Sequence, residues 1–229
     1  LGATAIDVLV RAERLDGATQ TVRLTPSSTS FVVEATPGRM EVVRSYLPMG
    51  VGHILGGFDH LLFVLALLII TQGTWRLVKT VTAFTVAHSI TLTAATLGFV
   101  HVPQRPVEAV IALSIVFVAA EIVHARRGVQ GLAARAPWIV AFTFGLMHGL
   151  GFAGGLSEAG LPAAHVPIAL LCFSVGVEIG HVVFIAGALS AIALLRRSRI
   201  GFPRWTELVP TYAIGGVAMF WVIQRLSAF

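Results

Sequence analysis

The residues of this chain best suited to chemistry are histidines and acids that fall inside apolar stretches. The densest group is Gly50-Val-Gly-His-Ile-Leu-Gly-Gly-Phe-Asp-His-Leu-Leu-Phe63, which carries His53, Asp59 and His60. It lies within an apolar run over residues 47–70, which is long enough to cross a bilayer because a spanning helix needs about 20 residues. Ionisable side chains inside a span are costly, and they usually mark a site or a pathway. On one continuous helix, the two histidines would lie on nearly the same face.

Ionisable side chains recur in three later apolar stretches, at a depth similar to that of His60 when each helical residue advances about 1.5 Å. Such groups should face the interior of a helix bundle, so we expect them to converge. The predicted metal site consists of His53, Asp59, His60, His88, His148, Glu178 and His181. The residues expected along the pathway or in a second shell around the site are Ser89, Glu108, Ser114, Glu121 and Ser174.

The types of these side chains indicate which ion they would hold. Imidazole and carboxylate groups suit borderline divalent ions such as nickel, cobalt, zinc and copper. Calcium or magnesium would require more oxygen ligands. Asp59 either binds the metal itself or orients His60 from the second shell. The alternative is a network of hydrogen bonds that only holds the helices together. Glu108 is expected to be an entrance charge, and Glu121 an exit or structural acid.

The composition predicts an all-α polytopic membrane protein. The chain has 229 residues, of which 56% are hydrophobic and 12% charged, and its mean hydropathy is +0.86. These values lie outside the range of soluble globular domains. The net charge of +5 does not indicate nucleic-acid binding, because no basic stripe carries interleaved aromatic residues. The single cysteine, Cys172, precludes an internal disulfide.

We predict two parts along the chain. Residues 1–38 form a short extracytoplasmic β segment, which is either a small cap or the end of a larger β domain. Its expected strands cover residues 5–14, 19–24 and 30–34, which are rich in valine and threonine. Residues 45–229 form a domain of six transmembrane helices. The expected spans are residues 47–70, 77–100, 107–123, 137–155, 166–195 and 208–226.

The charges of the loops predict the orientation of these spans. Loops one, three and five carry nine lysine and arginine residues, whereas loops two and four carry only Arg105. Cytoplasmic loops carry an excess of basic residues, so the odd loops are expected in the cytoplasm. The β segment and the C-terminus then both lie outside. We expect contacts with lipid and with a metal ion, and a protein partner for the β segment.

Five ordered motifs resemble the HupE/UreJ membrane proteins. They are His53-Ile-Leu-Gly-Gly-Phe-Asp-His60, Phe84-Thr-Val-Ala-His-Ser-Ile-Thr-Leu92, Val107-Glu-Ala-Val-Ile-Ala-Leu-Ser114, Phe144-Gly-Leu-Met-His-Gly-Leu-Gly-Phe-Ala153 and Phe173-Ser-Val-Gly-Val-Glu-Ile-Gly-His181. The resemblance covers about residues 50–185. It implies a permease of the bacterial inner (plasma) membrane that takes up nickel, or cobalt, for hydrogenase or urease. Ser174 and His181 stand where Asn and Gln are usual in that family.

Three functions remain open from the sequence. The first is a transition-metal permease that binds Ni²⁺ or Co²⁺ as its substrate at the predicted site. The second is an intramembrane zinc hydrolase, with Zn²⁺ held by histidines and Asp59 or Glu178 as the general base. The third is a metal-sensing or partner-binding membrane module. No nucleotide-binding loop motif is present in the sequence, so transport would be passive or ion-coupled unless a separate ATPase subunit exists.

Overall fold

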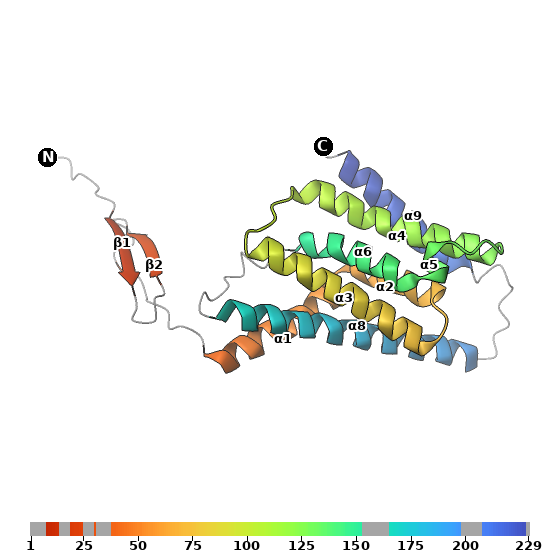
Figure 1. The fold of residues 1–229 in the computed structure, drawn as a ribbon, viewed down its shortest axis with the longest axis horizontal. Coiled ribbons are helices and arrows are strands. Elements are labelled where there is room, and N and C mark those ends of the chain that lie inside the picture. Colours follow the sequence, from red (N-terminus) through yellow and green to blue (C-terminus); the bar gives the residue numbers. More distant parts are fainter. Residues whose placement is uncertain are drawn as a thin grey trace.

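The computed structural model of the chain describes residues 8–13, 19–24, 30, 38–152, 165–197 and 208–227. Within these ranges it contains a two-stranded sheet and a bundle of helices (Figure 1). The elements are β1 (Val8–Glu13), β2 (Thr19–Leu24), α1 (Arg39–Gly56), α2 (Phe58–Ile70), α3 (Thr74–Thr96), α4 (Gln104–Arg126), α5 (Leu132–Arg135), α6 (Pro137–Leu150), α8 (Val166–Arg197) and α9 (Val209–Leu226).

The first two predicted strands are present as a hairpin. Strands β1 and β2 pair antiparallel, with Val8 opposite Leu24 and Glu13 opposite Thr19. Most of the third predicted strand, residues 30–34, lies outside the described residues. A two-stranded hairpin is at best marginally stable in water. Its side of the membrane stays a prediction.

Two pairs of parallel helices pack closely because glycines lie where they touch. In the pair of α1 and α8, a Cβ atom at Gly50 would collide with the carbonyl oxygen of Phe173, and one at Gly176 with that of Leu47. In the pair of α3 and α6, a Cβ atom at Gly149 would collide with the carbonyl oxygen of His88. Small residues at such contacts let two backbones approach, which is a common mode of helix association in membranes.

Helix α2 lies within the bundle and supplies much of its core. Phe63, Ala66 and Leu67 are fully buried there, and they pack with residues of α3, α4, α6 and α9. The predicted span over residues 47–70 is not one continuous helix, because the chain bends by 71° between α1 and α2. The bend occurs at Gly57, which has an extended ψ of 92°. The adjacent Gly56 and Gly57 have poor helix propensity, so this is where a helix breaks most easily.

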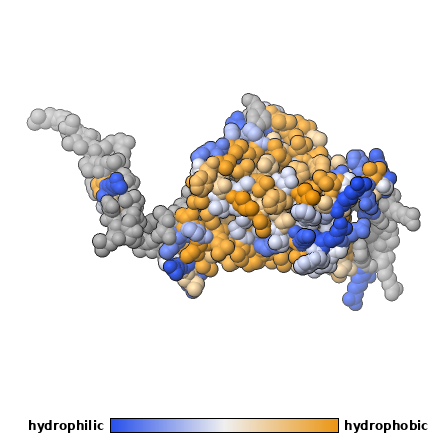
Figure 2. Space-filling view, viewed as in Figure 1, coloured by the Kyte–Doolittle hydropathy of each residue, from blue (hydrophilic) through white to orange (hydrophobic). Residues whose placement is uncertain are grey.

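Helices α4 and α8 are each long and apolar enough to cross a membrane, and the bent pair of α1 and α2 makes a third if it counts as one span. Helix α6 is apolar but shorter. Two or three spans are thus identified among the described residues. Figure 2 shows hydrophobic residues across the middle of one face of the bundle, with hydrophilic residues towards its ends. Leu113, Phe117 and Phe220 are among the exposed apolar residues of the helices.

Candidate metal centre

Four histidines from four helices meet inside the bundle. His53 lies in the last turn of α1, His60 in the first turn of α2, His88 within α3 and His148 in the last turn of α6. The ring of His60 is central, with its centroid 4.8 Å from that of His53, 5.7 Å from that of His88 and 4.9 Å from that of His148. Three of the rings are buried, and His53 is half-buried.

Three of these histidines are close enough to share one metal ion. Candidate ligand nitrogens of His53, His60 and His88 all lie within 4.8 Å of one another. Nitrogens bound to one ion lie about 3 to 3.5 Å apart, because each metal–nitrogen bond is about 2.0–2.1 Å. The three rings would therefore have to draw together by about 1–2 Å around an ion. Both nitrogens of His88, and Nε2 of His53 and of His60, are buried without a hydrogen-bond partner among the described residues.

Asp59 controls which nitrogen of His60 is available. Its Oδ1 accepts a hydrogen bond from the backbone N–H of His60 at 2.9 Å and lies 3.0 Å from Nδ1 of the same ring. A carboxylate in that position favours a proton on Nδ1, which leaves the lone pair on Nε2. Nε2 is the nitrogen without a partner among the described residues, so this tautomer leaves His60 able to bind a metal through Nε2.

Ser114 acts on His148 in a similar way. The Ser114 hydroxyl donates its single proton to the carbonyl oxygen of Ile111 at 2.6 Å, and its oxygen lies 3.2 Å from Nε2 of His148. That hydroxyl oxygen can then only accept from the ring, so Nε2 carries the proton. The lone pair is on Nδ1, which is buried and has no partner among the described residues. His148 thus has an unprotonated nitrogen, able to bind a metal, next to the other three histidines.

His181 and Glu178 of α8 lie beside this group rather than in it. Nδ1 of His181 lies 3.1 Å from the hydroxyl of Thr85, and the ring packs against Phe84 at a centroid distance of 5.5 Å. Glu178 accepts a hydrogen bond of 2.8 Å from the Thr82 hydroxyl. Phe84 also contacts His60, His88 and His148, so its ring packs against histidines of both groups. Ser89 and Ser174 line a groove between α3 and α8 together with Glu178.

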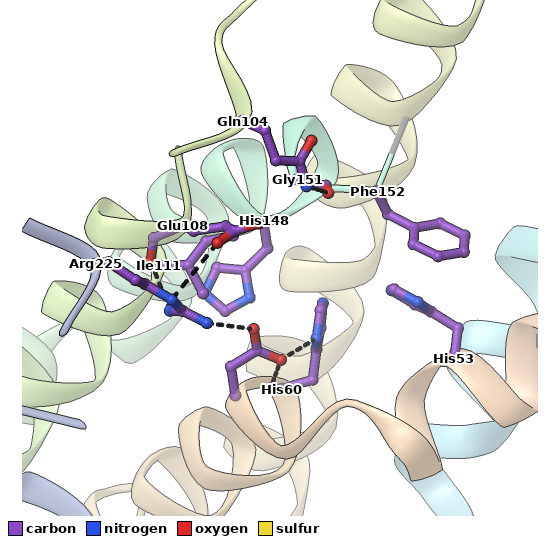
Figure 3. A pocket seen from close by; sticks show the side chains of 10 residues that line it. His53, His60, Gln104, Glu108, Ile111, His148, Gly151, Phe152 and Arg225 are labelled. Carbon is purple, nitrogen blue, oxygen red and sulfur yellow. Dashed lines mark hydrogen bonds and ion pairs between the residues drawn. The ribbon is translucent and has the colours of Figure 1, made fainter. Parts of the chain in front are cut away.

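A cavity of about 230 Å³ leads to the histidines, and its lining includes His53, Asp59, His60, Glu108, His148 and Arg225. Figure 3 shows Arg225 reaching across it towards Glu108 and the start of α2. The guanidinium is 3.9 Å from Oδ2 of Asp59 and 3.8 Å from Oε2 of Glu108, and it donates a hydrogen bond of 2.7 Å to the Glu108 carbonyl oxygen. The cavity is bounded by the first turns of α2 and α4 and the last turns of α1, α6 and α9.

Residues 28–225 match the family model described as HupE / UreJ protein. The chain belongs to the HupE/UreJ family. It is therefore an integral membrane protein, in agreement with its apolar helices. No curated protein and no solved structure shows significant similarity to the chain.

The structure refines the sequence prediction of this HupE/UreJ site in three places. His53 and His60 meet, but they do so across a bend rather than along one helix face. Glu121 has a structural position, because its carboxylate accepts a hydrogen bond of 2.9 Å from the backbone N–H of Ala133 in α5. Arg225 was missed. Its position at the end of the last apolar stretch is typical of a charge that only flanks a span, and only its contacts reveal another role.

Proposed function

We propose that this HupE/UreJ protein is a permease for a divalent transition metal, with Ni²⁺ as the first candidate substrate and Co²⁺ as the second. The observation that carries the proposal is the group of four histidines, whose unpaired nitrogens lie at the end of a polar cavity. Buried polar groups are normally hydrogen-bonded, so several unpaired nitrogens together favour a site that an ion occupies. The family resemblance supports nickel or cobalt.

The proposed path begins at the cavity. With six spans and both chain ends outside, the start of α4 and the ends of α6 and α9 face the exterior, and these are the turns that bound the cavity. The ion would pass Glu108, lose water and bind between His53, His60 and His88. The β segment of residues 1–38 would remain outside as a surface for a protein partner, beyond the membrane domain of residues 45–229.

The arrangement of the acids favours a permease over a hydrolase. A hydrolase needs a carboxylate free to take a proton from a metal-bound water. Asp59 is instead engaged by the His60 ring and lies near Arg225, and Glu178 accepts a hydrogen bond from Thr82. Asp59, which lines the cavity together with His53 and His60, is therefore not free to act as a general base.

Uptake by proteoliposomes tests the proposal. Vesicles that contain the purified protein should accumulate radioactive Ni²⁺ faster than empty vesicles, and His60→Ala should reduce uptake to the level of empty vesicles. His124→Ala is the matched control, because His124 is exposed at the end of α4 and should not affect transport. Normal uptake by a folded His60→Ala protein would remove His60 from the site, and no uptake by the wild type would refute the permease.

A further inference from the structure

We infer that Arg225 is a selectivity residue, which occupies the two carboxylates of the cavity so that hard cations such as Mg²⁺ and Ca²⁺ do not bind there. This inference rests on the proposed function, because it concerns which ion reaches the histidines. It follows from the position of one permanent positive charge between two acids at the end of the last helix (Figure 3).

The contacts of Arg225 hold its guanidinium at the wall of the cavity, beside Asp59 and Glu108. The strongest is the hydrogen bond of 2.7 Å that Nη1 donates to the backbone carbonyl oxygen of Glu108. The Trp221 ring, one turn earlier on α9, has its centroid 5.8 Å from the guanidinium carbon, within reach of a cation–π contact. The Arg225 side chain is only 23% exposed. Arg225 is therefore part of the cavity wall rather than a solvated surface charge.

Without Arg225, the cavity would present a site for the wrong ions. Asp59 and Glu108 both line it, and carboxylate oxygens are the ligands that Mg²⁺ and Ca²⁺ prefer. A volume of about 230 Å³ leaves room for an ion that keeps part of its water. Arginine is always protonated in proteins, so Arg225 offsets one of these two negative charges at every physiological pH.

The same charge affects soft and hard ions differently. A guanidinium in the cavity repels every divalent cation. Ni²⁺ and Co²⁺ can offset that repulsion by binding imidazole nitrogens of His53, His60 and His88, which suit them as ligands. Mg²⁺ and Ca²⁺ bind imidazole poorly, so they have no such compensation. Arg225 thus lowers the occupancy of hard ions more than that of transition metals.

The two ion pairs are loose enough to be exchanged. Their separations of 3.9 Å and 3.8 Å exceed the roughly 2.7–2.9 Å of a tight charge-assisted hydrogen bond. An incoming ion that gains imidazole ligands can therefore displace the guanidinium from Asp59. The backbone hydrogen bond to Glu108 keeps Arg225 nearby, so that the pair with Asp59 can form again after the ion has left.

The experiment compares the affinities of the detergent-purified full chain for Ni²⁺ and Mg²⁺ by calorimetry, including competition. Arg225→Gln should lower the ratio of Ni²⁺ affinity to Mg²⁺ affinity by about tenfold or more, which corresponds to at least about 1.4 kcal/mol. Arg225→Lys should give a smaller change, because lysine keeps the charge but not the planar fork that spans two acids. Arg44→Gln, on the exposed face of α1, removes the same charge elsewhere and should leave the ratio unchanged.

A second substitution tests the mechanism. Adding Glu108→Gln to Arg225→Gln removes one of the freed carboxylates, so the ratio should return towards the wild-type value. An unchanged ratio in Arg225→Gln would overturn the inference, as would an equal rise in both affinities, since Arg225 would then act as a general counter-charge only. If Arg225→Gln does not fold, a wild-type ratio in Arg225→Lys overturns it. Failure of the wild-type protein to bind Ni²⁺ would instead refute the proposed function.

Discussion

Replacement of Asp59 tests whether this acid acts through His60. Asp59→Asn removes the negative charge but keeps an oxygen that can accept from Nδ1 of His60, whereas Asp59→Ala removes both. In either variant, the preference for a proton on Nδ1 weakens, and the fraction of His60 rings that offer Nε2 to a metal falls. We therefore expect Ni²⁺ affinity to decrease from the wild type to Asp59→Asn and further to Asp59→Ala.

The size of the effect follows from the position of the carboxylate. Substitution of a group that orients a metal-binding histidine typically lowers metal affinity by about 10–100-fold, or about 1.4–2.8 kcal/mol. Asp59 is 24% exposed, and water can replace part of its interaction with the ring. Asp59→Asn should consequently lie near the tenfold end of the range and Asp59→Ala near the hundredfold end. His60→Ala, which removes the ligand itself, should cost more than either.

A double-substitution cycle, measured by Ni²⁺ calorimetry in detergent, distinguishes orientation from direct ligation. If Asp59 acts only through His60, the protein with both Asp59→Ala and His60→Ala should bind as weakly as His60→Ala alone. If Asp59 is itself a ligand, the double variant should bind more weakly still. Glu41→Gln, at the exposed start of α1, is the control for loss of an acid. Wild-type affinity in a folded Asp59→Ala protein would refute the role of Asp59.

Three further predictions concern topology, packing and protons. A cysteine at position 127 should be labelled only from the cytoplasm, and one at position 101 only from outside, in intact cells; the reverse pattern would refute the orientation. Gly149→Ala should lower the unfolding temperature and weaken Ni²⁺ binding, because the added methyl group collides with the backbone of His88. Gly216→Ala is the control, because its methyl group would meet no atom within 4 Å. Thermal unfolding and calorimetry should show no change in this control. Acidification from about pH 8 to 5 should weaken Ni²⁺ binding, because imidazole, with a free pKa near 6.5, must be neutral to bind metal. More than one proton should be taken up for each ion released, and calorimetry in buffers of differing ionisation enthalpy measures the number of protons. A proton uptake near zero would mean that the histidines are not ligands.

The meeting of the histidines was predictable because it follows from a general physical constraint. Charged or polar groups deep in a span avoid lipid, so side chains at equal depth on several helices turn to a common interior. His60, His88 and His148 satisfy that constraint, and all three are buried. The constraint does not determine which neighbours lie between the groups. The ring of Phe84 packs against His181 and also against His60, His88 and His148, and a side chain without polar atoms gives no signal of such a position.

The role of Arg225 was not predictable for a different reason. Its partners Asp59 and Glu108 lie far from it in the sequence, on α2 and α4. The contact exists only because α4 and α9 run antiparallel, which brings the last turn of α9 to the first turns of α4. A pattern along one helix contains no information about that pairing. The same arginine at the end of an isolated span would be an ordinary residue at the membrane boundary.

The bend at Gly57 allows His53 and His60 to move relative to each other, which a single helix would not. On a continuous helix, the backbone hydrogen bonds of the intervening residues would hold His53 and His60 about two turns apart. In the structure they belong to two helices joined at a glycine, and a Cβ atom there would press on the His53 carbonyl oxygen and the His60 ring. A small change of angle at this joint moves one ring relative to the other without breaking either helix. The closure of about 1–2 Å that a metal requires can therefore occur at the bend. Broken helices are common in membrane transporters, where the ends of the half-helices are directed at the substrate.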